Sequence, residues 1–91
     1  MTFTEQELKQ IEQMASLYLP ITDIATVLGV WPEDLRRQVK IKGNPVAIAY
    51  QKGKTMRKVE LRKQEIQLAQ VGSPLALDNA RKALIEMEED E

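Results

Sequence analysis

The fold is decided by residues 21–35, which read ITDIATVLGVWPEDL. Apolar side chains in the first part of this stretch recur at helical spacing up to Gly29. Because glycine often takes the left-handed position just after a helix, residues 21–28 are predicted to form a helix of about two turns. Pro32 suits the first position of a next helix, which we expect to run to about Ile41. Two short helices joined by a tight turn are therefore predicted.

Capping patterns indicate three further helices. Thr4, with glutamate three residues later, forms a capping-box pattern for a first helix that we expect to continue to Pro20. Asn44-Pro45 and Ser73-Pro74 each place a capping residue before a proline. They predict a long helix ending near Gln70 and a last amphipathic helix after it. No segment alternates in the way that a half-buried strand does.

The expected fold is therefore all-α, with two regions. Residues 1–43 are predicted to form a three-helix domain of the helix-turn-helix type. Residues 44–91 are predicted to form a helical hairpin, made of the long helix and the C-terminal amphipathic helix, for packing and oligomerisation. The acidic tail 86–91 is expected to fray, and the carboxylates of Glu86 and Glu89 are expected to be solvated in a polar segment without a pocket.

The composition excludes several classes of chemistry. The 91 residues include no cysteine and no histidine, which removes disulfides, zinc fingers and Ser-His-Asp or Cys-His catalysis. Only carboxylate-ligated metals remain chemically open. No acid/base constellation is visible, so no catalytic residue, metal ligand or cofactor is predicted and the protein is not expected to be an enzyme.

Export and membrane signals are not expected either. The start Met-Thr-Phe-Thr-Glu has neither the basic nor the apolar region of a signal peptide. No apolar run approaches the roughly 18–20 residues needed to span a bilayer. We therefore predict a soluble protein of a reducing compartment, with no membrane partner.

Charge is distributed in blocks along the chain. The 13 Lys and Arg residues against 14 Asp and Glu residues give a formal net charge of −1. Residues 1–35 carry one base and six acids, residues 36–63 carry ten bases and one acid, and residues 64–91 carry two bases and seven acids. Because local charge density sets the attraction for a polyanion, the basic middle favours contact with phosphates. The alternative is a solvated helix face balanced by the acidic flanks.

The two short helices have the spacing of a helix-turn-helix motif, with Gly29 at the turn and Leu35 securing the following helix. In this motif the second helix lies in the major groove of DNA, and its outward side chains contact base edges. The residues of this region predicted to contact DNA are Trp31, Glu33, Arg36, Arg37, Lys40 and Lys42. Gln38 departs from the motif, because an apolar residue is usual there. A helical pair that only forms a core is the alternative.

The long predicted helix adds a second group of bases. On a helical wheel, one arc collects Lys54, Arg57, Lys58 and Arg62, which are also predicted to contact DNA. Like charges four residues apart repel, and a phosphate backbone or an acidic partner would relieve that repulsion. Gly53 lies in the middle of this helix, where either the close approach of another helix or a kink would explain it.

Four stretches carry a resemblance to a known family. They are FTEQEL at 3–8, IATVLGV at 24–30 with Pro32 after it, YQKGK at 50–54 and LAQVGSPLA at 68–76. Together they resemble phage terminase small subunits and related phage helix-turn-helix proteins. Such proteins recognise the packaging site in viral DNA, assemble into rings and hand the DNA to the large subunit. The resemblance implies DNA-binding roles for Arg36, Arg37 and Lys40 and oligomerisation through the two C-terminal helices.

The predicted function is that of a non-catalytic DNA-binding protein of phage or prophage type, similar to a terminase small subunit. The expected partners are double-stranded DNA, further copies of the chain and the terminase large subunit, in the cytoplasm of a bacterial host cell. Two alternatives stay open. One is a small transcriptional regulator that uses the same helix pair as a dimer, and the other is a protein-interaction adaptor whose basic helix docks on acidic segments.

Overall fold

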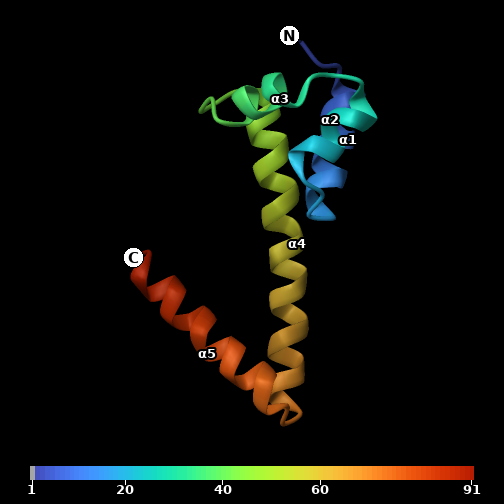
Figure 1. Cartoon of the computed structure of the whole chain (residues 1–91). Coiled ribbons are helices and arrows are strands. Elements are labelled where there is room, and N and C mark those ends of the chain that lie inside the picture. The colour runs from blue at the N-terminus through green and yellow to red at the C-terminus, as the bar shows by residue number, and fades with distance from the viewer. Residues whose placement is uncertain (1) are drawn as a thin grey trace. The chain divides into compact units, whose positions relative to one another are not determined.

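The computed structural model describes residues 2–91, which form five α-helices and no strand (Figure 1). The helices are α1 (Glu5–Ser16), α2 (Ile21–Leu28), α3 (Pro32–Val39), α4 (Pro45–Gln70) and α5 (Pro74–Glu89). The all-α class is thus confirmed. None of the helices in the described part of the chain is both long enough and apolar enough to cross a membrane.

The chain divides into two compact units within α4. Unit 1 ends at Arg57, and unit 2 comprises Lys58–Glu91. The sequence placed its boundary earlier, between residues 43 and 44, where the breakers stand. The boundary in the structure is later because Val46, Ala47 and Gly53, all in the first part of α4, are buried in unit 1.

The start of α1 follows the predicted capping box. The Thr4 hydroxyl accepts a hydrogen bond from the Glu7 backbone N–H at 3.1 Å, and the Thr4 N–H donates to Glu7 Oε1 at 2.9 Å. Each of these bonds satisfies a backbone donor that a helix start leaves without an intrahelical partner.

The end of α1 corrects a prediction, because the helix stops at Ser16 and does not continue to Pro20. Tyr18 takes the left-handed conformation, with φ of 58°. Its N–H donates to the Ala15 carbonyl at 2.9 Å, and the Leu19 N–H donates to the Met14 carbonyl at 3.2 Å. These two bonds form a Schellman motif, which closes the helix with a tyrosine in the position that glycine usually takes.

The turn between α2 and α3 forms as the sequence predicts. Gly29 has φ of 73°, and the Val30 N–H donates to the Ala25 carbonyl at 3.0 Å. Helix α3 then begins with Pro32 in its first turn and ends at Val39, two residues before the predicted Ile41.

The core of unit 1 is small and apolar. Its buried cluster comprises Ile11, Met14, Ile24, Ala25, Leu35 and Val46, so that α1, α2, α3 and the start of α4 each contribute. Gly53 lies against α1, since a Cβ added there would be 2.1 Å from the carbonyl oxygen of Glu12 and 3.0 Å from the Cβ of Ala15. The predicted close approach of another helix at Gly53 is confirmed.

Gln38, the residue that departs from the motif, connects α3 to α4. Its side-chain carbonyl accepts a hydrogen bond of 2.7 Å from the Asn44 amide. Asn44 Oδ1 in turn accepts the Val46 N–H at 2.8 Å, at the start of α4. A half-buried polar residue is therefore satisfied here, where an apolar one was expected.

Unit 2 consists of the second part of α4, a turn at Gly72 and α5. Gly72 takes the left-handed conformation, with φ of 95°. The Ser73 hydroxyl accepts a hydrogen bond of 3.3 Å from the Ala76 N–H, as its predicted capping position before Pro74 requires. Helix α5 continues to Glu89, so most of the acidic segment 86–91 is helical in the structure. Throughout residues 58–91, Ala76 is the single buried apolar residue.

Candidate nucleic-acid interface

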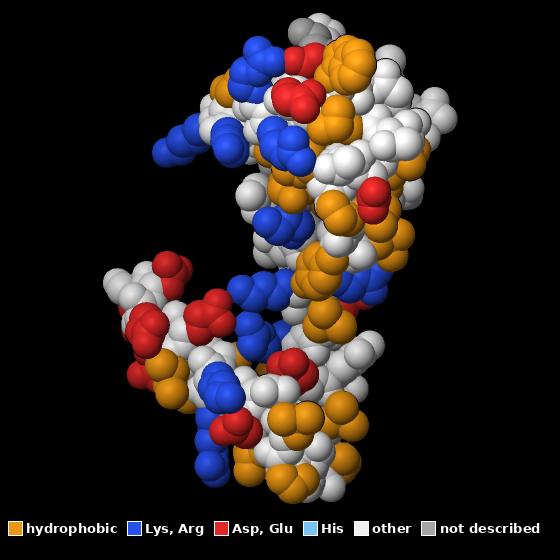
Figure 2. Space-filling model, viewed as in Figure 1, with side chains coloured by type: hydrophobic (Ala, Val, Ile, Leu, Met, Phe, Trp, Pro, Cys, Tyr) orange, Lys and Arg blue, Asp and Glu red, His pale blue; other side chains and the backbone are white. Residues whose placement is uncertain are grey.

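Helix α3 presents a charged outer face. Leu35 is 1% exposed and anchors the helix to the core. On a helical wheel, an arc of about 100° opposite Leu35 collects Glu33, Arg36, Arg37 and Lys40, and all four are exposed. Four of the six residues predicted in this region thus share one surface. Figure 2 shows Lys and Arg side chains gathered over α3 and the turn that follows it.

The two arginines of α3 have different neighbours. Arg36 donates a hydrogen bond of 3.1 Å to the Thr22 hydroxyl at the start of α2. A guanidinium carries five N–H donors, and this bond uses one of them. Arg37 forms an ion pair with Asp34 of the same helix, and its side chain is 73% exposed. Because an exposed ion pair contributes about 0–1 kcal/mol, Arg37 can exchange this partner for another anion.

The charges of α3 follow the helix dipole. Glu33 and Asp34 lie in its first turn and the two arginines in its last, which is the favourable arrangement for each sign. The acids at the start of the helix therefore stabilise it, although they repel phosphates from that end. A neutral or cationic group, such as the amino group of a cytosine, suits Glu33 better than a phosphate does.

Trp31 stands exposed at the cap position that precedes α3. Its exposed fraction is 74%, and that of Val27 in α2 is 64%. The sequence predicts that Trp31 contacts DNA, and the structure places its side chain at the surface. Tryptophan is enriched in interfaces, because one side chain combines a large apolar area with a hydrogen-bond donor.

The bases that follow α3 lie in the turn toward α4. Lys40 is the C-terminal cap residue of α3, and both Lys40 and Lys42 are exposed. Long cationic side chains on an exposed turn can contact phosphate oxygens without fixing a base sequence.

The predicted basic stripe of α4 is divided between the two units. In unit 1, the Lys54 ammonium lies 5.1 Å from the centre of the Tyr50 ring, and Arg57 Nε donates to the Ser16 carbonyl at 2.8 Å. The Arg57 bond satisfies a carbonyl at the end of α1. Arg57 therefore has a structural role that the sequence did not predict.

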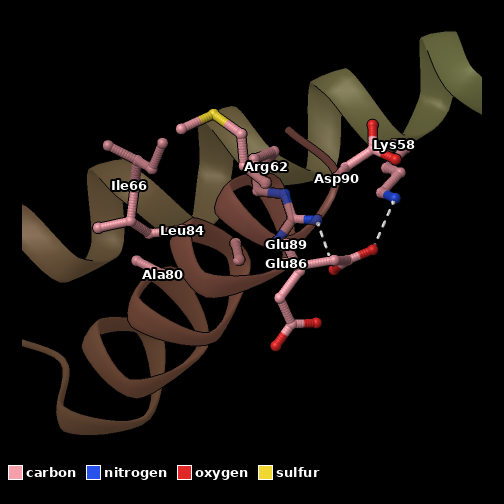
Figure 3. A pocket seen from close by; sticks show the side chains of 10 residues that line it. Lys58, Arg62, Ile66, Ala80, Leu84, Glu86, Glu89 and Asp90 are labelled. Atoms are coloured by element: carbon pink, nitrogen blue, oxygen red, sulfur yellow. Dashed lines mark hydrogen bonds and ion pairs between the residues drawn. The ribbon is translucent and has the colours of Figure 1, made fainter.

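Lys58 and Arg62, the remaining two bases of the stripe, lie in unit 2 and share one carboxylate. Lys58 Nζ is 3.4 Å from Glu86 Oε1, and Arg62 is 3.7 Å from Glu86 Oε2 (Figure 3). Arg62 also approaches Glu65, at 4.0 Å. Lys58, Arg62 and Glu86 line a groove between α4 and α5, together with Glu89, Asp90 and an apolar floor. The expectation that Glu86 and Glu89 lie in a segment without a pocket is therefore wrong.

The candidate interface is therefore built from exposed charged side chains. It offers charged side chains on a short helix and separate lysines and arginines on exposed surfaces. Within the described residues, no group of three Asp, Glu, His or Cys side chains is placed to hold a metal ion. Comparison with protein-family models, with curated proteins and with solved structures finds no match.

Proposed function

We propose that this chain is a non-catalytic DNA-binding protein in which α2 and α3 act as a helix-turn-helix. The observation that carries the proposal is the outer face of α3, where Glu33, Arg36, Arg37 and Lys40 are exposed on the side opposite a buried leucine. In the proposed complex, this face enters the major groove and contacts base edges.

The turn before α3 supports this role. Gly29 in the left-handed conformation lets α3 follow α2 within three residues. The complete burial of Ile24 and Ala25 holds α2 in the core. The hydrogen bond from Arg36 to Thr22 adds a contact between the two helices. Outward side chains on a rigid helix can reach bases in a fixed orientation, which is what direct readout requires.

The side chains on this face also match known pairings with bases. An arginine that contacts guanine through two hydrogen bonds contributes about 1–3 kcal/mol of discrimination, and a glutamate accepts a hydrogen bond from cytosine. Lys40, Lys42 and Lys54 are assigned to phosphates, whose contacts position the protein on the duplex.

The test is a comparison of two double variants in fluorescence anisotropy, on a duplex selected from a random pool by the wild-type protein. Arg36→Ala with Arg37→Ala is expected to weaken binding at least about tenfold, from the cost of lost base contacts. Arg81→Ala with Lys82→Ala removes the same charge from α5 and serves as the control. Equal affinities of the two double variants would refute the role of α3.

The proposed context is recognition of viral DNA for packaging, as the resemblance to terminase small subunits implies, and it includes assembly into a homo-oligomer. Unit 2 supports self-association, because large apolar residues of α4, α5 and the turn between them are exposed there. They include Val59, Leu61, Ile66, Leu68, Val71, Leu75, Leu77, Leu84, Ile85 and Met87, each at least 41% exposed. Figure 2 shows such side chains around the α4–α5 turn.

The size of unit 2 also favours self-association. Segments below about 40 residues usually need disulfides, metals or oligomerisation to be stable, and residues 58–91 form such a segment. Disulfides cannot form, because the chain has no cysteine. Burial of apolar side chains against further copies remains as a source of stability.

Light scattering separates the two DNA-binding contexts. A ring of many subunits favours packaging and the terminase large subunit as a partner, whereas a dimer favours a transcriptional regulator. A monomer at all concentrations would contradict both. If no duplex binds and the protein instead forms a stable complex with an acidic segment of another protein, the adaptor role replaces DNA binding.

A further inference from the structure

The carboxylate of Glu86 occupies a position between two cations. Each of its oxygens faces one base, at 3.4 Å from Lys58 Nζ and 3.7 Å from Arg62. The two bases are spaced four residues apart on α4 and therefore lie one turn apart on the same side of the helix. A backbone phosphate of DNA offers the same feature as this carboxylate, namely several oxygens that share one negative charge.

We propose that the acidic end of α5 competes with DNA phosphate for Lys58 and Arg62, and that Glu86 is the competing group. This proposal rests on the proposed DNA-binding function. It adds a contact within the protein that lowers the affinity for DNA. In the structure, Glu86 contacts both bases. DNA engages them when the Glu86 carboxylate leaves.

The surroundings of the two bases strengthen the competition. Glu65 approaches Arg62 at 4.0 Å from its own helix, α4. Glu89 at the end of α5 and Asp90 after it line the groove that contains Lys58 and Arg62 (Figure 3). The groove is thus lined by two bases and three carboxylates, with Glu65 beside Arg62 as a fourth carboxylate outside the lining. Its local charge is negative and repels a polyanion as long as the end of α5 stays in place.

The contacts are also weak enough to be displaced. The side chains of Lys58 and Glu86 are 56% and 65% exposed, so water and salt screen the pair. Few apolar contacts hold α5, because Ala76 near its start is the single buried apolar residue of residues 58–91. The closely spaced phosphates of DNA can therefore displace Glu86. A single anion at low concentration is attracted less strongly to the two bases.

The competition lowers the sequence-independent part of DNA affinity. Phosphate contacts supply most non-specific binding, and the base contacts assigned to α3 do not involve Glu86. Occupation of Lys58 and Arg62 by Glu86 therefore weakens binding to every duplex by a similar factor. It prevents the basic stripe from holding the protein on DNA that α3 does not recognise.

The test uses Glu86→Gln in the full chain, with Glu88→Gln as the control. Both variants remove one negative charge from the exposed end of α5 and keep the size of the side chain. Binding to a short fluorescein-labelled duplex is measured by anisotropy over a series of salt concentrations. Glu86→Gln is expected to bind about three- to tenfold more tightly at low salt, with a slope of log K against log salt that is steeper by about 1–2. Glu88→Gln is expected to change the affinity less than about twofold.

Equal gains in the two variants would overturn the proposal, because total charge would then explain the effect. The triple variant Lys58→Ala, Arg62→Ala, Glu86→Gln must lose the gain, and a gain that persists also overturns the proposal. Failure of the proposed function gives a different result. If the α3 double variant binds as the wild type does while Glu86→Gln still gains affinity, the role of α3 fails and the competition stands. If neither the wild type nor Glu86→Gln binds any duplex, both fail.

Discussion

Replacement of Gly53 by alanine tests the packing of α4 against α1. An alanine Cβ at this position would be 2.1 Å from the carbonyl oxygen of Glu12, 2.9 Å from its carbonyl carbon and 3.0 Å from Ala15 Cβ. Carbon and oxygen atoms that are not bonded do not approach to 2.1 Å, so one helix must move away from the other by about 1 Å. The Glu12 oxygen belongs to the backbone and cannot rotate away.

Two opposing effects set the magnitude. Alanine is about 1 kcal/mol more favourable than glycine in the interior of a helix. Extra atoms in a closely packed site typically cost about 1–3 kcal/mol, and contact with backbone places Gly53 in the upper part of that range. We expect a net loss of about 1–2 kcal/mol in the free energy of unfolding. For a chain of this size, that loss corresponds to a decrease of about 4–15 °C in Tm.

The assay is thermal and urea unfolding followed by circular dichroism. Gln51, which is exposed on the same helix, provides the control through the pair Gln51→Gly and Gln51→Ala. There the alanine variant is expected to be the more stable one by about 1 kcal/mol, because propensity acts alone. The sign must reverse at position 53. A Gly53→Ala variant that is more stable than the wild type would refute the close approach of the two helices.

Three further predictions concern the ends of α1 and are measured by urea unfolding. Thr4→Ala is expected to lower the free energy of unfolding by about 1 kcal/mol, because the Glu7 N–H loses its acceptor, and an unchanged value would contradict the capping box. Tyr18→Gly is expected to raise it by up to about 1 kcal/mol, since glycine adopts the left-handed conformation without strain; a decrease would contradict this reasoning. Arg57→Met keeps the apolar stem but removes the hydrogen bond to Ser16, and is expected to lower it by about 0.5–1.5 kcal/mol. A neutral effect of Arg57→Met would show that the bond does not stabilise the end of α1.

The starts of the helices could be predicted from the sequence because adjacent residues determine them. Thr4 and Ser73 accept hydrogen bonds from N–H groups three residues later, and Asn44 does so two residues later. Prolines then occupy the first position of three helices. Signals of this kind lie within one helical turn and need no knowledge of the tertiary fold.

The end of α1 could not be predicted by the same rule. At the ends of α2 and α4, a glycine takes the left-handed position, as the sequence indicates. At the end of α1, Tyr18 takes it instead. Apolar residues at helical spacing continue past that point, so periodicity alone extends the helix too far.

The sequence predicted which residues form the exposed face of α3, but not which residues the bases on α4 contact. The outer face of α3 follows from the position of one buried leucine, because the helical period places the other residues. The partners of the bases on α4 are distant in sequence: Arg57 and Ser16 are 41 positions apart, and Lys58 and Glu86 are 28 positions apart. No local pattern contains such pairs. The acidic segment was expected to be solvated, and Glu86 is indeed exposed, but its ion pairs with Lys58 and Arg62 could not be predicted.

The hydrogen bonds that link Gln38, Asn44 and the start of α4 have a consequence for how this protein can change. They fix the rotation of α3 about its own axis through residues that do not lie on its outer face. The side chains at positions 33, 37 and 40 can therefore be replaced while the orientation of α3 is kept, whereas Arg36 also bonds Thr22 of α2. Under the proposed function, exchange of these residues is expected to change which DNA sequence is bound, while Gln38 and Asn44 keep α3 in place.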